Sequence, residues 1–493
     1  MEFQQTQCRY LRTVGRETAN EEQTLEVRLP ESMPDIGRVL GAWGQPLIRS
    51  KEWRSGSMGL SGGVMAWILY APEDGTGPRS IEAWIPFQRS WELRDSQRDG
   101  ILRMCCNLAA MDARSLSARK LMLRAGLSFF AEALEPGQET LYEPPKLPED
   151  IELLQESYPV TLPAEAGEKS FVLDEELDIP GEMGGGEKLF RCNLHPELTD
   201  QKIMGDKVVF RGSALGHVLL RNREGQLRGW DFEVPFSQYA QLDREYDPES
   251  LVDLLPAVTN LEMELQEGGR LRLKAGIVGQ YLVYERSMIR VVLDAYSPRR
   301  EVKPELTMLS LPALLEQTDG ILTAQRPWEQ EGREPLDISF LLSQPDVSRE
   351  GDNWMLDLTG HFGLLSENAE GAIQADSVKW EDSKQIPAGK DARLHARAQI
   401  SGRPKVTGGE LRCDVRTHLS FTAQTQIPMV SGLEVGEMLP PDPNRPSLIL
   451  RRCNGEGLWE MAKHSGTTVE AIRQANSLTG DPEPNRLLLI PVP

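Results

Sequence analysis

Apolar and polar residues alternate along the segment from residue 271 to residue 283. Its apolar members share one parity: Leu271, Leu273, Ala275, Ile277, Tyr281 and Val283. Arg272, Lys274 and Gln280 lie on the other parity. A period of two is typical of a strand in an antiparallel sheet with one buried and one solvated face. The same alternation recurs at 121–129 and 411–421, so the pattern predicts three β-rich regions.

Landmark residues recur at nearly constant spacing, which indicates an internal repeat. A second copy follows the first by 150 positions, as four pairs show: Gly62 and Gly212, Gly75 and Gly225, Leu121 and Leu271, Gly126 and Gly276. A third, more diverged copy follows at an offset of 140 to 144, where Gly408-Gly409 matches Gly268-Gly269. Paired glycines before a strand favour a tight hairpin, because glycine adopts positive φ at little cost.

These patterns predict a mainly β chain of three tandem antiparallel domains, each a sandwich or an open barrel. The boundaries are 1–135, 170–298 and 299–427. Residues 136–169 are rich in Pro and Glu, which predicts an exposed linker with a short helix at 149–155. Residues 428–446 contain a Pro-Pro-Asp-Pro run, which predicts a second, stiff and extended linker.

Helical periodicity replaces the strand pattern in residues 447–493. Leu458, Trp459, Met461 and Ala462 fit one face of a short helix that Gly466 ends. Thr467-Thr468-Val469-Glu470 reads as a capping box that opens a second helix, whose inner face has Val469, Ile472 and Ala475. Apolar runs at 447–451 and 486–490 predict a strand before and after the helices. The expected unit is therefore a small βααβ domain.

This C-terminal unit resembles a LysM domain. The similarity rests on Gly455-Glu456-Gly457-Leu458-Trp459, Ala462-Lys463, residues 466–470, Ala475-Asn476 and residues 487–491. The family's usual Gly-Asp-Thr before the first helix is Gly455-Glu456-Gly457 here, which removes a capping side chain and one hydroxyl.

The two loops that join a strand to a helix should lie side by side at one end of the small sheet. In the LysM family that end is the glycan groove. The candidate partner-binding or glycan-binding residues are accordingly Asn454, Gly455, Glu456, Gly457, Asn476, Ser477 and Leu478.

The whole chain resembles the SPOCS-LysM spore coat morphogenetic proteins of clostridia, through Pro34-Asp35-Ile36, Val234-Pro235-Phe236 and the LysM-like unit. The resemblance implies a non-enzymatic scaffold in the mother-cell cytoplasm, at the forespore surface. Its LysM domain would dock onto a coat morphogenetic ATPase of the SpoIVA type. The alternative function is binding of peptidoglycan or other N-acetylglucosamine polymers by the LysM domain.

The net charge of −21 over 493 residues argues against nucleic acid and anionic membranes as partners, since both need a basic surface. No apolar run reaches about 18 residues, so no membrane span is expected. The N-terminal segment lacks the apolar core of a signal peptide, and the six cysteines have no repeated spacing. Both features predict a cytoplasmic protein with free thiols. Exposed sheet edges make self-association a further expectation.

Candidate catalytic residues do not form a recognisable motif. The six histidines are isolated, with no second ligand at a metal-binding spacing. His217 and His361 occupy the same repeat position, but the first copy has Trp67 there, which favours a strand residue packed against a neighbour. We therefore expect neither an enzyme nor a cofactor.

Overall fold

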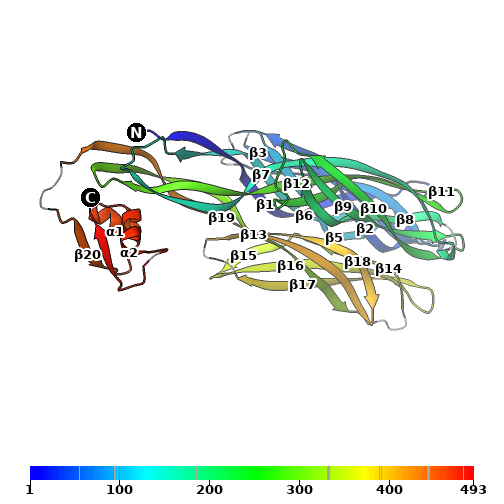
Figure 1. Cartoon of the computed structure of the whole chain (residues 1–493). Coiled ribbons are helices and arrows are strands. Elements are labelled where there is room, and N and C mark those ends of the chain that lie inside the picture. The colour runs from blue at the N-terminus through cyan, green and yellow to red at the C-terminus, as the bar shows by residue number, and fades with distance from the viewer. Residues whose placement is uncertain are drawn as a thin grey trace.

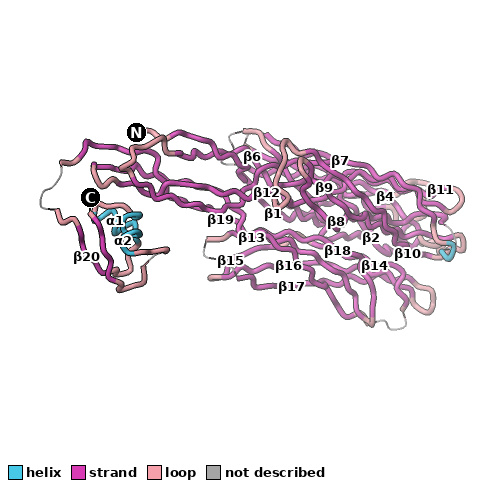
Figure 2. The backbone as a smooth tube through the Cα atoms, viewed as in Figure 1, coloured by secondary structure: helices cyan, strands magenta, loops and turns pink. Residues whose placement is uncertain are grey.

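The computed structural model describes residues 1–54, 56–93, 96, 98–183, 186–329, 333–387, 389, 391–440, 445–480 and 482–492. Strands dominate this part of the chain, and two short α-helices lie near its C-terminus (Figure 2). The predicted mainly β class is therefore confirmed. Figure 1 shows an elongated body, with the N-terminus and the C-terminal unit at the same end.

The first repeat consists of six strands in two antiparallel sheets. The strands are β1 (Gln4–Arg28), β2 (Ile36–Arg54), β3 (Ser57–Pro72), β4 (Arg79–Glu92), β5 (Ile101–Ser117) and β6 (Lys120–Glu143). One sheet has the order β2-β3-β4 and the other the order β1-β6-β5. Residues of both sheets share one buried apolar cluster, so the repeat is a β-sandwich.

The second repeat has the same strand order. Its elements are β7 (Glu152–Asp178), the 3-10 turn η1 (Gly181–Met183), β8 (Gly186–Met204), β9 (Lys207–Asn222), β10 (Leu227–Gln241), β11 (Leu251–Gln266) and β12 (Arg270–Tyr296). The sheets are β10-β9-β8 and β11-β12-β7, and they also enclose one apolar cluster.

The third repeat differs mainly in its second strand, which is split in two. Its strands are β13 (Arg300–Pro327), β14 (Glu334–Leu342), β15 (Asp346–Glu350), β16 (Asn353–Glu367), β17 (Ile373–Pro387), β18 (Arg393–Thr407) and β19 (Glu410–Met438). Both β14 and β15 pair with β16, and the other sheet has the order β13-β19-β18. The three copies predicted from residue spacing thus share one order of strands, apart from the split second strand of the third copy.

The recurring glycines have a packing reason. A Cβ on Gly62 would lie 2.1 Å from the carbonyl oxygen of Leu47 and 2.8 Å from the ring of Phe87. A Cβ on Gly212 would meet the carbonyl oxygen of Glu197 and the ring of Phe236 at the same two distances. The hairpin glycines were also predicted correctly, since Gly268 and Gly269 have φ of 88° and 80°.

The expected linker at 136–169 is strand over most of its length. β6 continues to Glu143, β7 begins at Glu152, and the helix expected at 149–155 is absent. The prolines misled the prediction. Pro136 lies where β6 has lost β5 as a neighbour, and Pro159 and Pro163 lie on the edge strand β7. An open edge needs no amide donor, so proline is tolerated there.

The second expected linker, 428–446, begins later than predicted. β19 pairs with β13 as far as Met438, and residues 441–444 of the Pro-rich run lie outside the described residues. In strand terms the repeats span 4–143, 152–296 and 300–438, which corrects the boundaries 1–135, 170–298 and 299–427.

The first and last strands of each repeat extend beyond the sandwich as two-stranded ribbons, and the three ribbons pack together. Tyr10, Val160 and Leu309 pair with corresponding positions of their own ribbons and are buried in one cluster. Ile289 and Ile427 join the same cluster. The three repeats therefore form one body, rather than separate domains on flexible linkers.

The C-terminal unit has the predicted order of elements, β20 (Leu448–Arg452), α1 (Leu458–Ser465), α2 (Val469–Asn476) and β21 (Leu487–Pro491). α1 ends at Gly466, which has φ of 60°. The N-cap of α2 is Thr468, whose Oγ1 accepts from the Ala471 amide at 3.1 Å. The helix thus starts one residue later than the predicted capping box requires. Ala475, expected on the inner face, is exposed.

Candidate functional site

The loops at 453–457 and 477–486 both join the β20–β21 sheet at the end where Arg452 and Leu487 pair, and their role in binding stays a prediction. Arg452 pairs with Leu487, so the loop that leaves β20 and the loop that enters β21 are neighbours. Asn454, Gly455 and Gly457 are exposed.

Two features hold the first loop in shape. Gly455 has φ of 93°, a conformation that favours glycine. The Glu456 carboxylate is half-buried and accepts from the Arg451 guanidinium at 2.9 Å. The Gly457 N-cap makes no side-chain hydrogen bond. The surface of this loop is therefore mainly backbone, with one carboxylate already paired.

Asn476 holds β21 in place. Its Nδ2 donates to the carbonyl oxygens of Leu489 (2.6 Å) and Ile472 (2.8 Å), and its Oδ1 accepts from the Leu489 amide at 2.8 Å. Ser477 ends α2 with φ of 51°, and the half-buried Leu478 packs against the core of the unit. Of the residues predicted in this second loop, only Ser477 is largely exposed.

The C-terminal unit is docked on the second repeat, mainly through α1. Asp294 of β12 accepts from Trp459 Nε1 at 2.8 Å and from Lys463 Nζ at 2.6 Å. The Tyr296 hydroxyl donates to the Thr467 carbonyl at 2.9 Å, and its ring meets the Trp459 ring edge-on at 4.7 Å. Trp459, assigned from the sequence to the core of the unit, thus also forms the contact between the unit and repeat 2.

A buried ionic cluster joins the three sandwiches. Arg103 of repeat 1 donates to Glu132 at 2.7 Å and to Asp253 of repeat 2 at 2.8 Å, and only 1% of it is exposed. Arg397 of repeat 3 also donates to Asp253, while Arg16 donates to Glu132. Burial opposes the charge on Asp253, but the two guanidinium groups outweigh it and hold its pKa well below the usual value.

A second cluster joins repeats 2 and 3 around Asp337. Arg191 donates to its carboxylate at 2.5 Å, and His217 Nε2 lies 2.7 Å from the other carboxylate oxygen. His217 Nδ1 is 2.7 Å from Asp231. Burial disfavours the imidazolium form, yet Asp337 and Asp231 together raise the pKa of His217. The predicted packing role of His217 is thus an ionic contact between repeats.

The contacts between repeats were missed by the sequence analysis, because Arg103, Arg397 and Asp337 each find a partner more than a hundred positions away. One signal was present. Arg103 and Asp253 stand 150 positions apart, at the same place in the repeat, with opposite charges.

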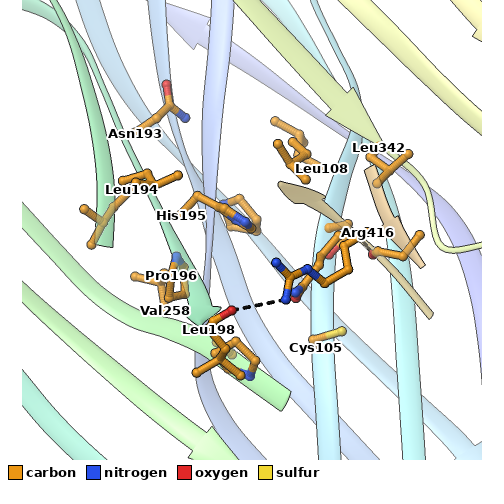
Figure 3. A pocket seen from close by; sticks show the side chains of 18 of the residues that line it. Cys105, Leu108, Asn193, Leu194, His195, Pro196, Leu198, Val258, Leu342 and Arg416 are labelled. Carbon is orange, nitrogen blue, oxygen red and sulfur yellow. Dashed lines mark hydrogen bonds between the residues drawn. The ribbon is translucent and has the colours of Figure 1, made fainter. Parts of the chain in front are cut away.

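A cavity of about 440 Å³ lies where the three sandwiches meet. It is lined mainly by the second and fifth strands of each repeat, β2 and β5, β8 and β11, β14 and β18. Figure 3 shows His195 and Arg416 among apolar side chains such as Leu108 and Leu342, with Arg416 donating to the Leu198 carbonyl at 3.2 Å. Burial lowers the pKa of His195, so its imidazole is neutral near pH 7.

The thiols at this cavity are not activated. Burial raises the pKa of Cys105 to about 11 and that of Cys106 well above its usual value. The thiolate is the reactive form, so neither group is a nucleophile near neutral pH. All six cysteines are unpaired. The described residues contain no cluster of His, Cys, Asp or Glu suited to a metal ion.

Neither of the two described α-helices is long and apolar enough to cross a membrane. Comparison of the chain with protein-family models, with curated proteins and with solved structures gave no match.

Proposed function

We propose that this chain is a non-enzymatic scaffold and adaptor in spore coat assembly. Its C-terminal LysM-like unit binds a coat morphogenetic ATPase of the SpoIVA type, in the mother-cell cytoplasm at the forespore surface. The observation that carries the proposal is the placement of this unit. It is attached to repeat 2 through Asp294 and Tyr296, and its loop end, with Asn454 and Gly455, stays exposed.

The shared core of the three repeats supports a scaffold role. Because the ribbons and the ionic clusters join all three sandwiches, the C-terminal unit is mounted on one large support. A support of this kind holds a bound partner in a defined orientation, which a chain of loosely linked domains does not do.

The chemistry of the loops favours a protein over a glycan. Gly457 stands where the LysM family has a hydroxyl residue, so one polar contact to a sugar is absent. The carboxylate of Glu456 is held by Arg451 at the loop surface and suits a basic group on a partner. Binding of peptidoglycan or N-acetylglucosamine polymers is the alternative, favoured by the position of both loops at one end of the sheet.

A binding assay with purified proteins tests the proposal. The full chain should bind the coat ATPase, a chain ending at residue 446 should not, and neither should sediment with purified peptidoglycan. Glu456→Lys should weaken ATPase binding about tenfold, through loss of one charged contact. Glu470→Lys, in the first turn of α2, is the matched control. Saturable sedimentation with peptidoglycan that Glu456→Lys abolishes would establish the alternative.

A further inference from the structure

Both faces of the β20–β21 ribbon are apolar. Ile449, Leu488 and Ile490 point inward and pack against the two helices. The outward positions carry four leucines with large exposed fractions: Leu448 (51%), Leu450 (62%), Leu487 (55%) and Leu489 (36%). Leu450 faces Leu489 across the ribbon, and Leu487 faces Arg452. A contiguous group of exposed leucines on so small a unit indicates an interaction surface.

The two edges of this ribbon differ. On β21, the side chain of Asn476 bonds both the amide and the carbonyl of Leu489, so that edge is closed. Residues directly opposite in an antiparallel pair direct their peptide groups either toward each other or both away. Since the peptide groups of Leu489 point away from β20, those of Leu450 point away from β21. The amide and carbonyl of Leu450 therefore lie on the outer edge of β20.

Nothing in the described chain covers that edge. β21 is the only element that packs extensively on β20, whereas α2 lies against β21. No described group outside the ribbon hydrogen-bonds to Leu448, Leu450 or Arg452. In Figure 1 the helices lie between the ribbon and the body of the molecule. β20 is thus an open edge strand with a leucine-rich face, and such an edge accepts a further strand.

We propose that β20 accepts an extended segment of the partner protein as a third strand of the C-terminal sheet. Alternate residues of this segment are apolar and cover Leu448 and Leu450, and a carboxylate at its end meets the exposed Arg452. This inference rests on the proposed function, and it names the surface and the chemistry of the partner segment.

Charge favours a different protein over a second copy of this chain. Residues 447–493 contain five Lys or Arg and five Asp or Glu, so the net charge of −21 lies entirely in residues 1–446. Two copies joined through β20 would bring two strongly acidic bodies together. The acidic end of a segment from another protein instead meets the C-terminal unit, which has no net charge, and the guanidinium group of Arg452.

The experiment measures binding to full-length chains that differ at one exposed leucine. Leu450→Glu should weaken binding of the coat ATPase at least about tenfold, because an apolar contact is lost and a carboxylate faces the acidic end of the segment. Leu306→Glu, at a 67% exposed leucine of β13, is the matched control and should bind like the wild type. Thermal melting checks that both variants fold.

Hydrogen exchange supplies a second readout. The Leu450 amide should exchange fast in the free chain and become protected on binding, whereas the Leu489 amide should be protected in both states. Equal binding by both variants, or an unprotected Leu450 amide in the complex, overturns the inference while leaving the proposed function intact.

A peptide arm separates the two claims. If the wild-type chain does not bind the ATPase, the proposed function fails, and a synthetic peptide of alternating Val and Thr ending in Glu is used as the probe. Binding of this peptide that Leu450→Glu abolishes supports the open edge. No binding, or dimerisation of the chain that Leu450→Glu abolishes, overturns it.

Discussion

The three repeats meet in two places, and the two junctions differ in chemistry. Where the ribbons converge, the corresponding residues Tyr10, Val160 and Leu309 are all apolar. Between the sandwiches, Arg103 and Asp253 occupy corresponding positions but carry opposite charges, and Arg397 completes the group. The same repeated scaffold thus supports one junction of similar residues and one of complementary residues.

The two junctions place different demands on the residues that the repeats share. Apolar side chains pack against copies of themselves, so every repeat can keep an apolar residue at a shared contact. Like charges at a shared buried contact repel one another strongly, because the interior screens them poorly. The ionic junction therefore requires different residues in different repeats. It consequently specifies which repeat lies beside which, whereas the apolar junction does not.

Truncation after Pro298 should have the largest effect, because it removes repeat 3 from both junctions. The fragment exposes apolar residues such as Val160 and Ile289 and leaves Asp253 without Arg397. Circular dichroism should show a fragment that aggregates or melts well below the full chain. Melting of both at the same temperature would contradict the shared core.

Asp253→Ala should break the ionic junction and leave two guanidinium groups without their carboxylate. Removing one partner of a buried pair costs about 3–5 kcal/mol. Urea unfolding of the full chain measures the loss. Asp243→Ala, at an exposed acidic residue of the same repeat, is the control and should change stability by less than about 0.5 kcal/mol. A similar small change for both variants would mean that the junction adds no stability.

Leu309→Ala should break the apolar junction at a cost of about 3 kcal/mol, from lost burial and the cavity that remains. Leu306→Ala on the same strand removes a 67% exposed side chain and should be nearly neutral. Measuring the stability losses of Leu309→Ala and Asp253→Ala at several pH values distinguishes the apolar junction from the ionic one. The Leu309→Ala loss should not vary with pH, because no titratable group changes.

Acid should weaken the ionic contacts selectively. The Asp337 pKa is lowered to about 2, since Arg191 and His217 outweigh the opposing effect of burial. The pKa of Asp337 is therefore lower in the folded chain than its value of 3.8 in the unfolded chain. The stability that the ionised carboxylate contributes is complete above pH 3.8 and is lost as pH falls toward 2. The loss is about 2 kcal/mol. The free energy of unfolding should therefore fall less steeply between pH 5 and pH 2 for Asp337→Asn than for the wild type.

His395 adds an earlier phase of acid sensitivity. Burial lowers its pKa to about 3, so it stays neutral in the folded chain. In the unfolded chain the pKa of His395 is 6.5. The folded state therefore keeps its full stability above pH 6.5 and loses stability as pH falls from there toward 3. His395→Gln should make the fall between pH 6 and pH 4 shallower. An unchanged slope would show that this imidazole is accessible to water.

Asp294→Ala should have the smallest effect on overall stability, about 1 kcal/mol or less, because it removes only the contacts of Asp294 to Trp459 and Lys463. It should nevertheless loosen the unit, seen as faster cleavage by a glutamate-specific protease at the exposed Glu437, which lies just before the unit. Asp200→Ala, at an exposed residue of β8, is the control. Equal cleavage rates would indicate that Tyr296 alone holds the unit.

Local patterns were sufficient for the features that depend on neighbouring residues. The alternation of Leu271 to Val283, the turn at Gly268-Gly269 and the helix end at Gly466 follow from backbone geometry and one-sided burial. The βααβ order of the C-terminal unit follows in the same way, and so does the recurrence of the β-sandwich.

Contacts between distant residues decided the rest. The strands at 136–143 and 152–169 exist because β6 pairs with β1 and β7 with β12, which outweighs their proline content. The partners of Arg103 and His217 lie in other repeats, and Asn476 is occupied because β21 lies beside it. Hydrophobic periodicity and turn residues act over a few positions. The sequence alone therefore predicts the strands of each repeat and the order of elements in the C-terminal unit. Their arrangement, the ionic junctions and the open edge of β20 were decided by tertiary structure, because packing and charge pairing depend on which surfaces meet.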